Sequence, residues 1–521
     1  MNTPLNRREF LADVGKGMLV ASVGSGLASE LGLTSGLAAE TAESLEFGAL
    51  EPLVRLMQET PPAGIVSALV GKIKSGTSLR DLVAAGALAN ARTFGGEDYV
   101  GFHTVMALAP ALHMSAELPT ERQPLPVLKV LYRNTNRIQE HGGRASEVLH
   151  AVAPVPLAEG RAGSEVLREA IHRKDATGAE QTLATLAQRS ADEAFNDLLH
   201  TVQEMPEVHR IVLPYRSWDL LDLIGKEHAQ TLLRQSVRYC VRAESWSQHA
   251  EQTEKPRALL PQLLDRHHLL DRAPGARVAD DHWIEEMSAT IFKSTPEQAA
   301  EAAAAALEEG FAPAQIGEAI SLAANQLILR DMGRTPRDEV ANKPIGSVHG
   351  DSIGVHACDS ANAWRNLARV SNARNTFACL ILGAYQVALD RVGRGGDFLN
   401  WSPLPVQWHL DQIKSAEPAA LLTEAEEAIR QNLQARAAAI IHRYGELGHP
   451  PRGAFDLLLK YAVSEDGSLH AEKYYRTASE EFAATRHAFR WRQLTALARV
   501  TASEFGRPAA GMAEARELLK V

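Results

Sequence analysis

The feature that most constrains this chain is a set of short motifs that occurs twice in the same order. The first motif, Asp98-Tyr-Val-Gly-Phe-His103, recurs in the second half of the chain as Asp351-Ser-Ile-Gly-Val-His356. The next motif, Ala194-Phe-Asn-Asp-Leu-Leu199, recurs as Ala454-Phe-Asp-Leu-Leu-Leu459. Unrelated motifs that recur in one order predict an internal duplication, in which two similar halves bury their apolar faces against each other.

The richest repeat is a group of polar residues late in each half. The first copy comprises His209, Tyr215, Arg216, His228, Arg234 and Gln235, and the second comprises His470, Tyr475, Arg476, His487, Arg492 and Gln493. After a duplication, surface residues diverge freely, whereas residues held by packing or chemistry diverge less. The retained histidines, tyrosines and arginines are therefore the candidates for function.

Helical periodicity runs through most of the sequence. The segments 296–309 and 423–444 are rich in alanine and carry charges at three- and four-residue spacing, which is typical of amphipathic helices. We find no run of alternating β-branched residues bounded by hairpin turns. We therefore predict an all-α fold, an internally duplicated multi-helical domain whose two halves are related by a pseudo-twofold axis.

The first residues match an export signal. Arg7 and Arg8 are followed by Phe10 and Leu11, and then by a mildly apolar stretch that glycines interrupt too often for a membrane span. We predict a periplasmic protein that the twin-arginine translocase exports already folded. This route is used by proteins that load a cofactor before export, so it raises the expectation of one.

Composition shifts give the remaining boundaries. We predict a signal peptide over residues 1–40, a first helical half over 41–252, a linker containing a short Leu-rich helix over 253–280, a second half over 281–508 and a tail over 509–521. The net charge of −10 is spread along the chain without a basic block, which argues against a nucleic-acid partner. Three widely spaced cysteines without a Cys-x-x-Cys motif argue against disulfides, a c-type haem or an iron–sulfur cluster, and favour buried thiols.

The retained histidines predict a metal site. Neutral imidazoles bind iron, copper and zinc, and a helical bundle can direct them inward from several helices. The candidate ligands are His103, His209, His228, His356, His470 and His487, in one joint site on the axis or in one three-histidine site per half. Iron or copper is favoured over zinc. Arg216 and Arg476 would then hold an anionic substrate group, and Tyr215 and Tyr475 would donate to a bound oxygen species.

A structural interpretation competes with this one. In it, the aspartate of each Asp-x-aliphatic-Gly-x-His motif caps a helix, and the histidine donates a hydrogen bond across an interface. The two interpretations differ in geometry. A metal site requires the ring nitrogens to converge, whereas structural histidines would be scattered and bonded to backbone carbonyls.

Three longer motifs carry a resemblance to a known family. They are Phe94-Gly-Gly followed by Phe102-His103-Thr-Val-Met-Ala, Leu223-Ile-Gly-Lys-Glu-His228, and Glu472-Lys-Tyr-Tyr-Arg-Thr followed by Phe489-Arg-Trp-Arg-Gln. The chain resembles an uncharacterised family of all-helical bacterial proteins with twin-arginine signals, some of them fused to a Rieske iron–sulfur domain. Such a fusion implies one-electron chemistry and a redox partner protein. The layout of histidines on helices is also similar to questin oxidase-like proteins, which are linked to oxygen-dependent ring cleavage.

Together these observations predict an exported metal-dependent oxidoreductase that acts on a small molecule. The alternative is a non-catalytic helical scaffold, or a protein of the cell envelope that binds a small molecule between the halves. A third possibility is a lyase or hydrolase with His356 as its base.

Overall fold

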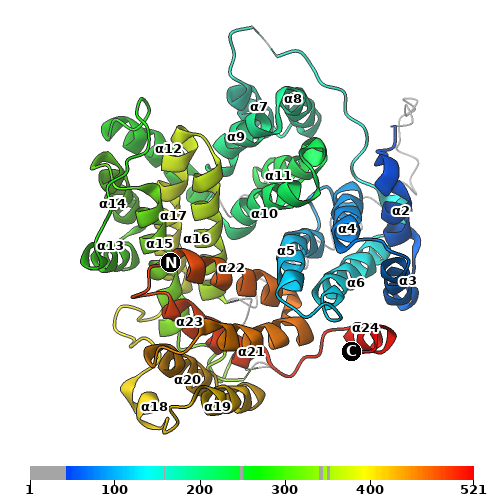
Figure 1. Ribbon diagram of the computed structural model, residues 1–521. Coiled ribbons are helices and arrows are strands. Elements are labelled where there is room, and N and C mark those ends of the chain that lie inside the picture. Colours follow the sequence, from blue (N-terminus) through cyan, green and yellow to red (C-terminus); the bar gives the residue numbers. More distant parts are fainter. Residues whose placement is uncertain (1–42, 158, 247–249, 340–343, 349–351) are drawn as a thin grey trace. The chain divides into compact units, whose positions relative to one another are not determined.

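Helix-start signals in the sequence lie where helices begin in the computed structural model, which describes residues 43–521 except 158, 247–249, 340–343 and 349–351. Asp98 caps α5 (Tyr99–Ala116) by accepting a hydrogen bond from the amide of Gly101. Thr295 and Gln298 form a capping box at the start of α14 (Pro296–Glu308). The described residues form helices and contain no β-strand, which confirms the all-α prediction (Figure 1).

Among the described residues, the first predicted half contains ten α-helices and the second contains eleven, and ten of these correspond in their order along the chain. The first series is α2 (Glu51–Glu59), α3 (Pro62–Lys74), α4 (Leu79–Phe94), α5, α6 (Pro124–Glu140), α7 (Gly163–His172), α8 (Ala176–Arg189), α9 (Ala191–Val202), α10 (Val208–Ile224) and α11 (Ala229–Ala243). The second series is α13 (Asp281–Lys293), α14, α15 (Pro313–Arg330), α16 (Ile353–Val370), α17 (Ala373–Arg394), α19 (Pro418–Arg430), α20 (Gln434–Glu446), α21 (Pro451–Ser464), α22 (His470–Ala484) and α23 (Trp491–Glu504), with the short α18 (Gln407–Asp411) inserted. The short 3-10 helices are η1 (Gly48–Leu50), η2 (Gly143–Ser146), η3 (Lys226–His228) and η5 (Gly467–Leu469).

The packing partners correspond as well as the order. In the first series α5 packs against α4, α6 and α10, and in the second α16 packs against α15, α17 and α22. Likewise α11 packs against α8, and α23 packs against α20. A duplicated chain would produce such a correspondence, so this arrangement supports the duplication, which remains our interpretation of the sequence repeat.

Four helices join the two series. Helix α10 packs against α16 of the other series, and α22 packs against α5, so that α5, α10, α16 and α22 surround a shared interior (Figure 1). Each of the four carries one of the repeated histidines within its first five residues. Because side chains on a helix lean toward its amino terminus, histidines at these positions point to the ends where the helices start.

The segments predicted as linker and tail are largely helical. Helix α12 (Ala250–Arg266) contains Pro256 and Pro261 and packs against α14 and α17, while α24 (Met512–Leu519) packs against α3 and α6. Leu45–Val521 form one compact unit. The predicted signal peptide, residues 1–40, lies outside the described residues. Within the described part of the chain, no helix combines the length and apolar character needed to cross a membrane.

Candidate four-histidine site

Four of the six predicted histidine ligands converge in the interior. The Nε2 atoms of His103 and His209 are 3.2 Å apart, and those of His356 and His470 are also 3.2 Å apart. The two pairs adjoin, because the ring centroids of His103 and His470 are 5.2 Å apart and those of His209 and His356 are 5.7 Å apart. The four rings thus form a closed group in which each predicted half contributes one pair. We call this group the four-histidine cluster.

Hydrogen bonds fix the tautomers of the first pair. The Nδ1 atom of His103 is 2.6 Å from the carbonyl oxygen of Tyr99, and the Nδ1 atom of His209 is 2.7 Å from Oε1 of Glu207. Both partners accept hydrogen bonds, so both Nδ1 atoms carry a proton. In the neutral rings both Nε2 atoms are therefore unprotonated and carry a lone pair, and the two atoms lie 3.2 Å apart. Two opposed lone pairs at this distance repel each other, and a cation between them would relieve the repulsion.

Either of two kinds of cation, a proton or a metal ion, fits between the opposed nitrogens. A proton on one Nε2 would form an N–H···N hydrogen bond, since 3.2 Å is within the range of such bonds. A metal ion fits as well: with metal–nitrogen bonds of about 2.0–2.1 Å, the same separation corresponds to a nitrogen–metal–nitrogen angle of about 100°, close to tetrahedral. In metal sites the second ring nitrogen is bonded to a carboxylate or a backbone carbonyl, as it is in both of these histidines.

Glu207 is the anchor of His209. It is the cap residue of α10 and accepts hydrogen bonds from the amides of His209 and Arg210, from the His209 ring and from the Tyr239 hydroxyl. Burial raises the pKa of Glu207, but the His209 ring and these hydrogen bonds outweigh it and lower the pKa to about 2. Glu207 is therefore ionised at neutral pH, and it can only accept the hydrogen bond from His209.

Burial keeps His103 and His470 in the neutral form that binds metals. The two residues are 3% and 5% exposed. Burial lowers the pKa of both histidines well below the usual value, and the nearby ammonium of Lys473 lowers it further. Neutral imidazoles with outward lone pairs are the form that transition metals bind.

Aromatic side chains cover the first pair. The Phe102 ring stacks on His103 with centroids 5.0 Å apart, and Tyr99 lies over the same imidazole at 4.4 Å. Phe102 in turn contacts Tyr239, whose hydroxyl donates to Glu207. Tyr99 is 51% exposed, whereas His103 beneath it is buried, so this tyrosine lies between the cluster and solvent.

Within the described part of the chain, each histidine pair stands without a third protein ligand close to both ring nitrogens. Among the described residues, no third histidine, cysteine or carboxylate atom lies within 4.8 Å of both Nε2 atoms of either pair. The four Nε2 atoms are therefore set as two pairs, and they do not converge on a single point. This geometry fits one ion per pair better than one ion shared by four ligands.

The other two predicted ligands, His228 and His487, lie outside the cluster. His228 is half-buried at the end of η3, and His487 is exposed in the turn before α23. His209 begins α10 and His228 follows its end, so a helix about 25 Å long separates them at 1.5 Å per residue. Helix α22 separates His470 from His487 in the same way. The six-histidine set therefore reduces to four.

The predicted tyrosines and arginines lie deeper along α10 and α22. Arg216 is 2% exposed, and its Nη1 atom is 3.3 Å from Asp219 and 3.7 Å from Glu480. Arg476 pairs with the same Glu480 at 2.7 Å, and the Tyr215 hydroxyl lies 3.3 Å from it. Because carboxylates of the chain already occupy both guanidinium groups, the geometry favours the structural interpretation of these residues over substrate binding.

Tyr475 also has a partner within the chain. Its hydroxyl donates to Glu117 at 2.8 Å, and Arg452 pairs with the same carboxylate at 2.9 Å.

Sequence reasoning assigned no role to three residues beside the cluster: Glu207, Asp359 and Lys473. Glu207 lies two residues before His209, where an acidic helix cap followed by histidine could have indicated an anchored imidazole. Asp359 and Lys473 lie three residues after His356 and His470, on the same helix faces. That spacing could have identified both as neighbours of the site.

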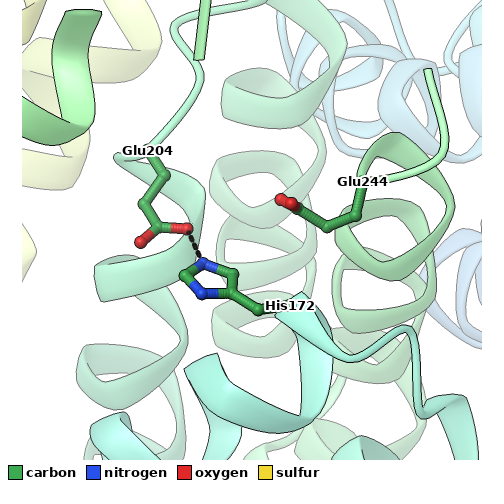
Figure 2. A group of neighbouring side chains, drawn as sticks. All are labelled: His172, Glu204 and Glu244. Carbon is green, nitrogen blue, oxygen red and sulfur yellow. Dashed lines mark hydrogen bonds and ion pairs between the residues drawn. The ribbon is translucent and has the colours of Figure 1, made fainter. Parts of the chain in front are cut away.

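A second cluster also meets the distance criterion for a metal site. His172, Glu204 and Glu244 have ligand atoms within 4.8 Å of one another, and His172 Nε2 lies 2.7 Å from Glu204 (Figure 2). Arginines already neutralise these carboxylates: Arg168 and Arg257 each approach Glu204 at 3.0 Å, and Arg257 also pairs with Glu244. We interpret this group as an ion-pair network, since an added cation would meet two guanidinium groups.

No protein-family model, no curated protein and no solved structure matches this chain. The resemblance noted in the sequence motifs therefore stays a prediction.

Proposed function

We propose that this protein is a metal-dependent oxidoreductase in which His103, His209, His356 and His470 bind transition-metal ions, one ion for each pair. The observation that carries the proposal is the 3.2 Å approach of the Nε2 atoms of His103 and His209. Their Nδ1 atoms are already hydrogen-bonded to a carbonyl and a carboxylate, which leaves the two Nε2 lone pairs facing each other. Burial of His103 and His470 supports it, because a protonated imidazole is disfavoured at both positions.

The catalytic class follows from the number of ligands. A structural metal site is usually filled by four protein ligands, whereas a catalytic site leaves positions for water, oxygen or substrate. Two histidines per ion leave such positions open. Iron and copper suit an imidazole ligand set and change oxidation state, so we favour them over zinc.

Metal analysis of the purified protein tests the proposal. The full chain should contain iron or copper at close to one ion per histidine pair, as measured by mass spectrometry of the elements. The double variant His103→Ala, His470→Ala breaks both pairs and should lose most of this metal. The matched control His228→Ala, His487→Ala removes two repeated histidines outside the cluster and should keep it.

The possible outcomes separate the alternatives. Equal metal content in both double variants would place any metal elsewhere. Metal below about one ion in ten chains in the wild type would favour the non-catalytic scaffold, since a functional site is mostly filled. Stoichiometric zinc, with no electron-paramagnetic signal before or after mild oxidation, would support metal binding but overturn the oxidoreductase class.

We further propose that the protein is periplasmic and crosses the membrane through the twin-arginine translocase. The support is the sequence around Arg7 and Arg8. The double variant Arg7→Lys, Arg8→Lys should accumulate in the cytoplasm, and an unchanged periplasmic fraction would contradict the proposal.

A further inference from the structure

A buried lysine, Lys473, places a positive charge beside the four-histidine cluster. Binding of a metal cation gives no reason for a second positive charge at this position. Lys473 is 3% exposed, and among the described residues its ammonium makes no hydrogen bond and no ion pair. An ammonium held in a buried position without such a partner is unfavourable, and a bound anion beside it would relieve that cost.

Two contacts between α22 and α16 place Lys473 beside the second histidine pair. The first is the 3.2 Å approach of His470 to His356, and the second is the hydrogen bond from the Thr477 hydroxyl to Asp359 at 2.8 Å. Lys473 lies between His470 and Thr477 on the same face of α22, three residues after one and four before the other. Its side chain leans toward the start of the helix, where the cluster lies.

The helix ends add to the positive potential. Helices α5, α10, α16 and α22 all start at the cluster, and the amino terminus of a helix carries about half a positive charge. Asp98, Glu207 and Ser352 cap the first three, but no side chain caps α22. The amide of His470 donates to the Gly467 carbonyl, and the start of α22, which carries Lys473, is thus the one of the four that has no side-chain acceptor.

The charge is also specific to one half. The positions of the first half that correspond to Lys473 are Val212 and Leu213, which are buried and apolar. Burial lowers the pKa of Lys473 to about 8, and the carboxylate of Asp359 acts against this by attracting the ammonium. The ammonium is therefore mostly protonated at neutral pH.

We propose that Lys473 and the uncapped start of α22 bind the carboxylate group of a small organic anion beside the His356–His470 pair. This inference rests on the proposed function, because the anion would lie next to the proposed metal ion. It also resolves an electrostatic conflict: a metal cation near Lys473 is repelled unless an anion lies between them. The substrate class is accordingly a small carboxylic acid, held by its carboxylate in the second half only.

Calorimetric titration of the full-length protein with acetate tests the inference, with acetamide as a neutral probe of the same shape. Acetate should bind and acetamide should not. Lys473→Met should weaken acetate binding about tenfold to a hundredfold, the loss expected for one charge-assisted hydrogen bond. The matched control Lys460→Met removes a half-exposed lysine that pairs with Glu426 and should leave acetate binding unchanged.

Metal content measured on the same samples separates this inference from the proposed function. Lysine-dependent acetate binding in metal-free protein would support the anion site and contradict the metal proposal. Normal metal content with equal acetate affinity in wild type and Lys473→Met would overturn the anion site alone. If Lys473→Met does not fold, the variant Lys473→Arg tests the inference instead. Arginine keeps the charge, so this variant should bind acetate within about threefold of the wild-type affinity. Loss of acetate binding in folded Lys473→Arg would overturn the inference.

Discussion

Replacing Glu207 by glutamine should switch the tautomer of His209. Three donors face Oε2 of Glu207, namely the amides of His209 and Arg210 and the Tyr239 hydroxyl, whereas only the His209 ring faces Oε1. A glutamine has one accepting oxygen, which the three donors will hold. Its NH₂ group then faces the Nδ1 atom of His209, and two N–H groups cannot face each other, so the ring proton moves to Nε2.

The moved proton would fill the space in which we place the metal. With Nε2 of His209 protonated, the 3.2 Å contact with His103 becomes an ordinary hydrogen bond. The pair can then bind a metal ion only after this proton has left Nε2. Loss of a carboxylate that orients a metal-bound histidine typically lowers metal affinity 10- to 100-fold, or about 1.4–2.7 kcal/mol. We expect a loss at the upper end of this range, because the substitution changes the tautomer as well as the orientation.

A competition titration against a chelator of known affinity measures this effect. Tyr239→Phe is the matched control, because it removes one hydrogen bond from Oε2 and leaves the bond between Oε1 and the His209 ring intact. It should change the metal affinity less than threefold. Nitrogen NMR of the metal-free Glu207→Gln variant should show His209 protonated at Nε2. Unchanged affinity in Glu207→Gln, or an Nε2 that stays unprotonated, would refute the reasoning about the lone pairs.

Three further predictions concern the surrounding fold. Burial, with Arg374 and Arg168 nearby, lowers the pKa of His200 from 6.5 to about 3, so the unfolded chain binds more protons between these values and stability falls as the pH drops through this window. His200→Gln should therefore gain about 1–2 kcal/mol relative to wild type in urea unfolding at pH 5 compared with pH 7.5, and a pH-independent difference would contradict this. Glu480→Gln leaves buried Arg216 poorly paired and should lower the free energy of unfolding by about 1–3 kcal/mol, whereas unchanged stability would show that the shared carboxylate contributes little. Gly96→Ala should destabilise the protein by about 2 kcal/mol more than Gly76→Ala. Both glycines have positive φ (+82° and +96°), but only at Gly96 would a Cβ meet a backbone oxygen, that of Gln235, at 2.3 Å. Equal unfolding midpoints of the two variants would rule out the clash.

Much of the fold could be predicted because its signals are local. Helix periodicity and caps such as Asp98 and Thr295 depend on a few neighbouring residues, and helices begin at both positions in the structure. The linker was harder to predict. Pro256 and Pro261 are typical breakers, yet both lie within α12, where packing of Leu263 and Leu264 into the core compensates for the lost backbone hydrogen bonds.

The histidine cluster could be predicted only in part. Retention in both halves identified His103, His209, His356 and His470, but it identified His228 and His487 equally well. Which histidines meet depends on which helix ends converge, and this is a property of tertiary packing. The spacing in the sequence does carry a signal that excludes His228: a full helix separates it from His209 and keeps the two side chains apart.

The charged partners of the arginines could not be predicted. Arg216 lies in the first half, and its carboxylate partner Glu480 lies in the second, more than 260 residues later. No local pattern links two such positions. The candidate role of Arg216 in substrate binding rested on residue type alone, and the structure offers a nearer partner for its guanidinium group.

The central claim is that a metal ion, and not a proton, lies between the opposed histidine nitrogens. Crystals of the natively exported protein, measured with X-rays above and below the iron and copper absorption edges, test it most directly. We expect one anomalous density peak between the Nε2 atoms of His103 and His209, and a second between those of His356 and His470. Electron density that places both pairs at hydrogen-bond distance with no anomalous peak at either edge would contradict it.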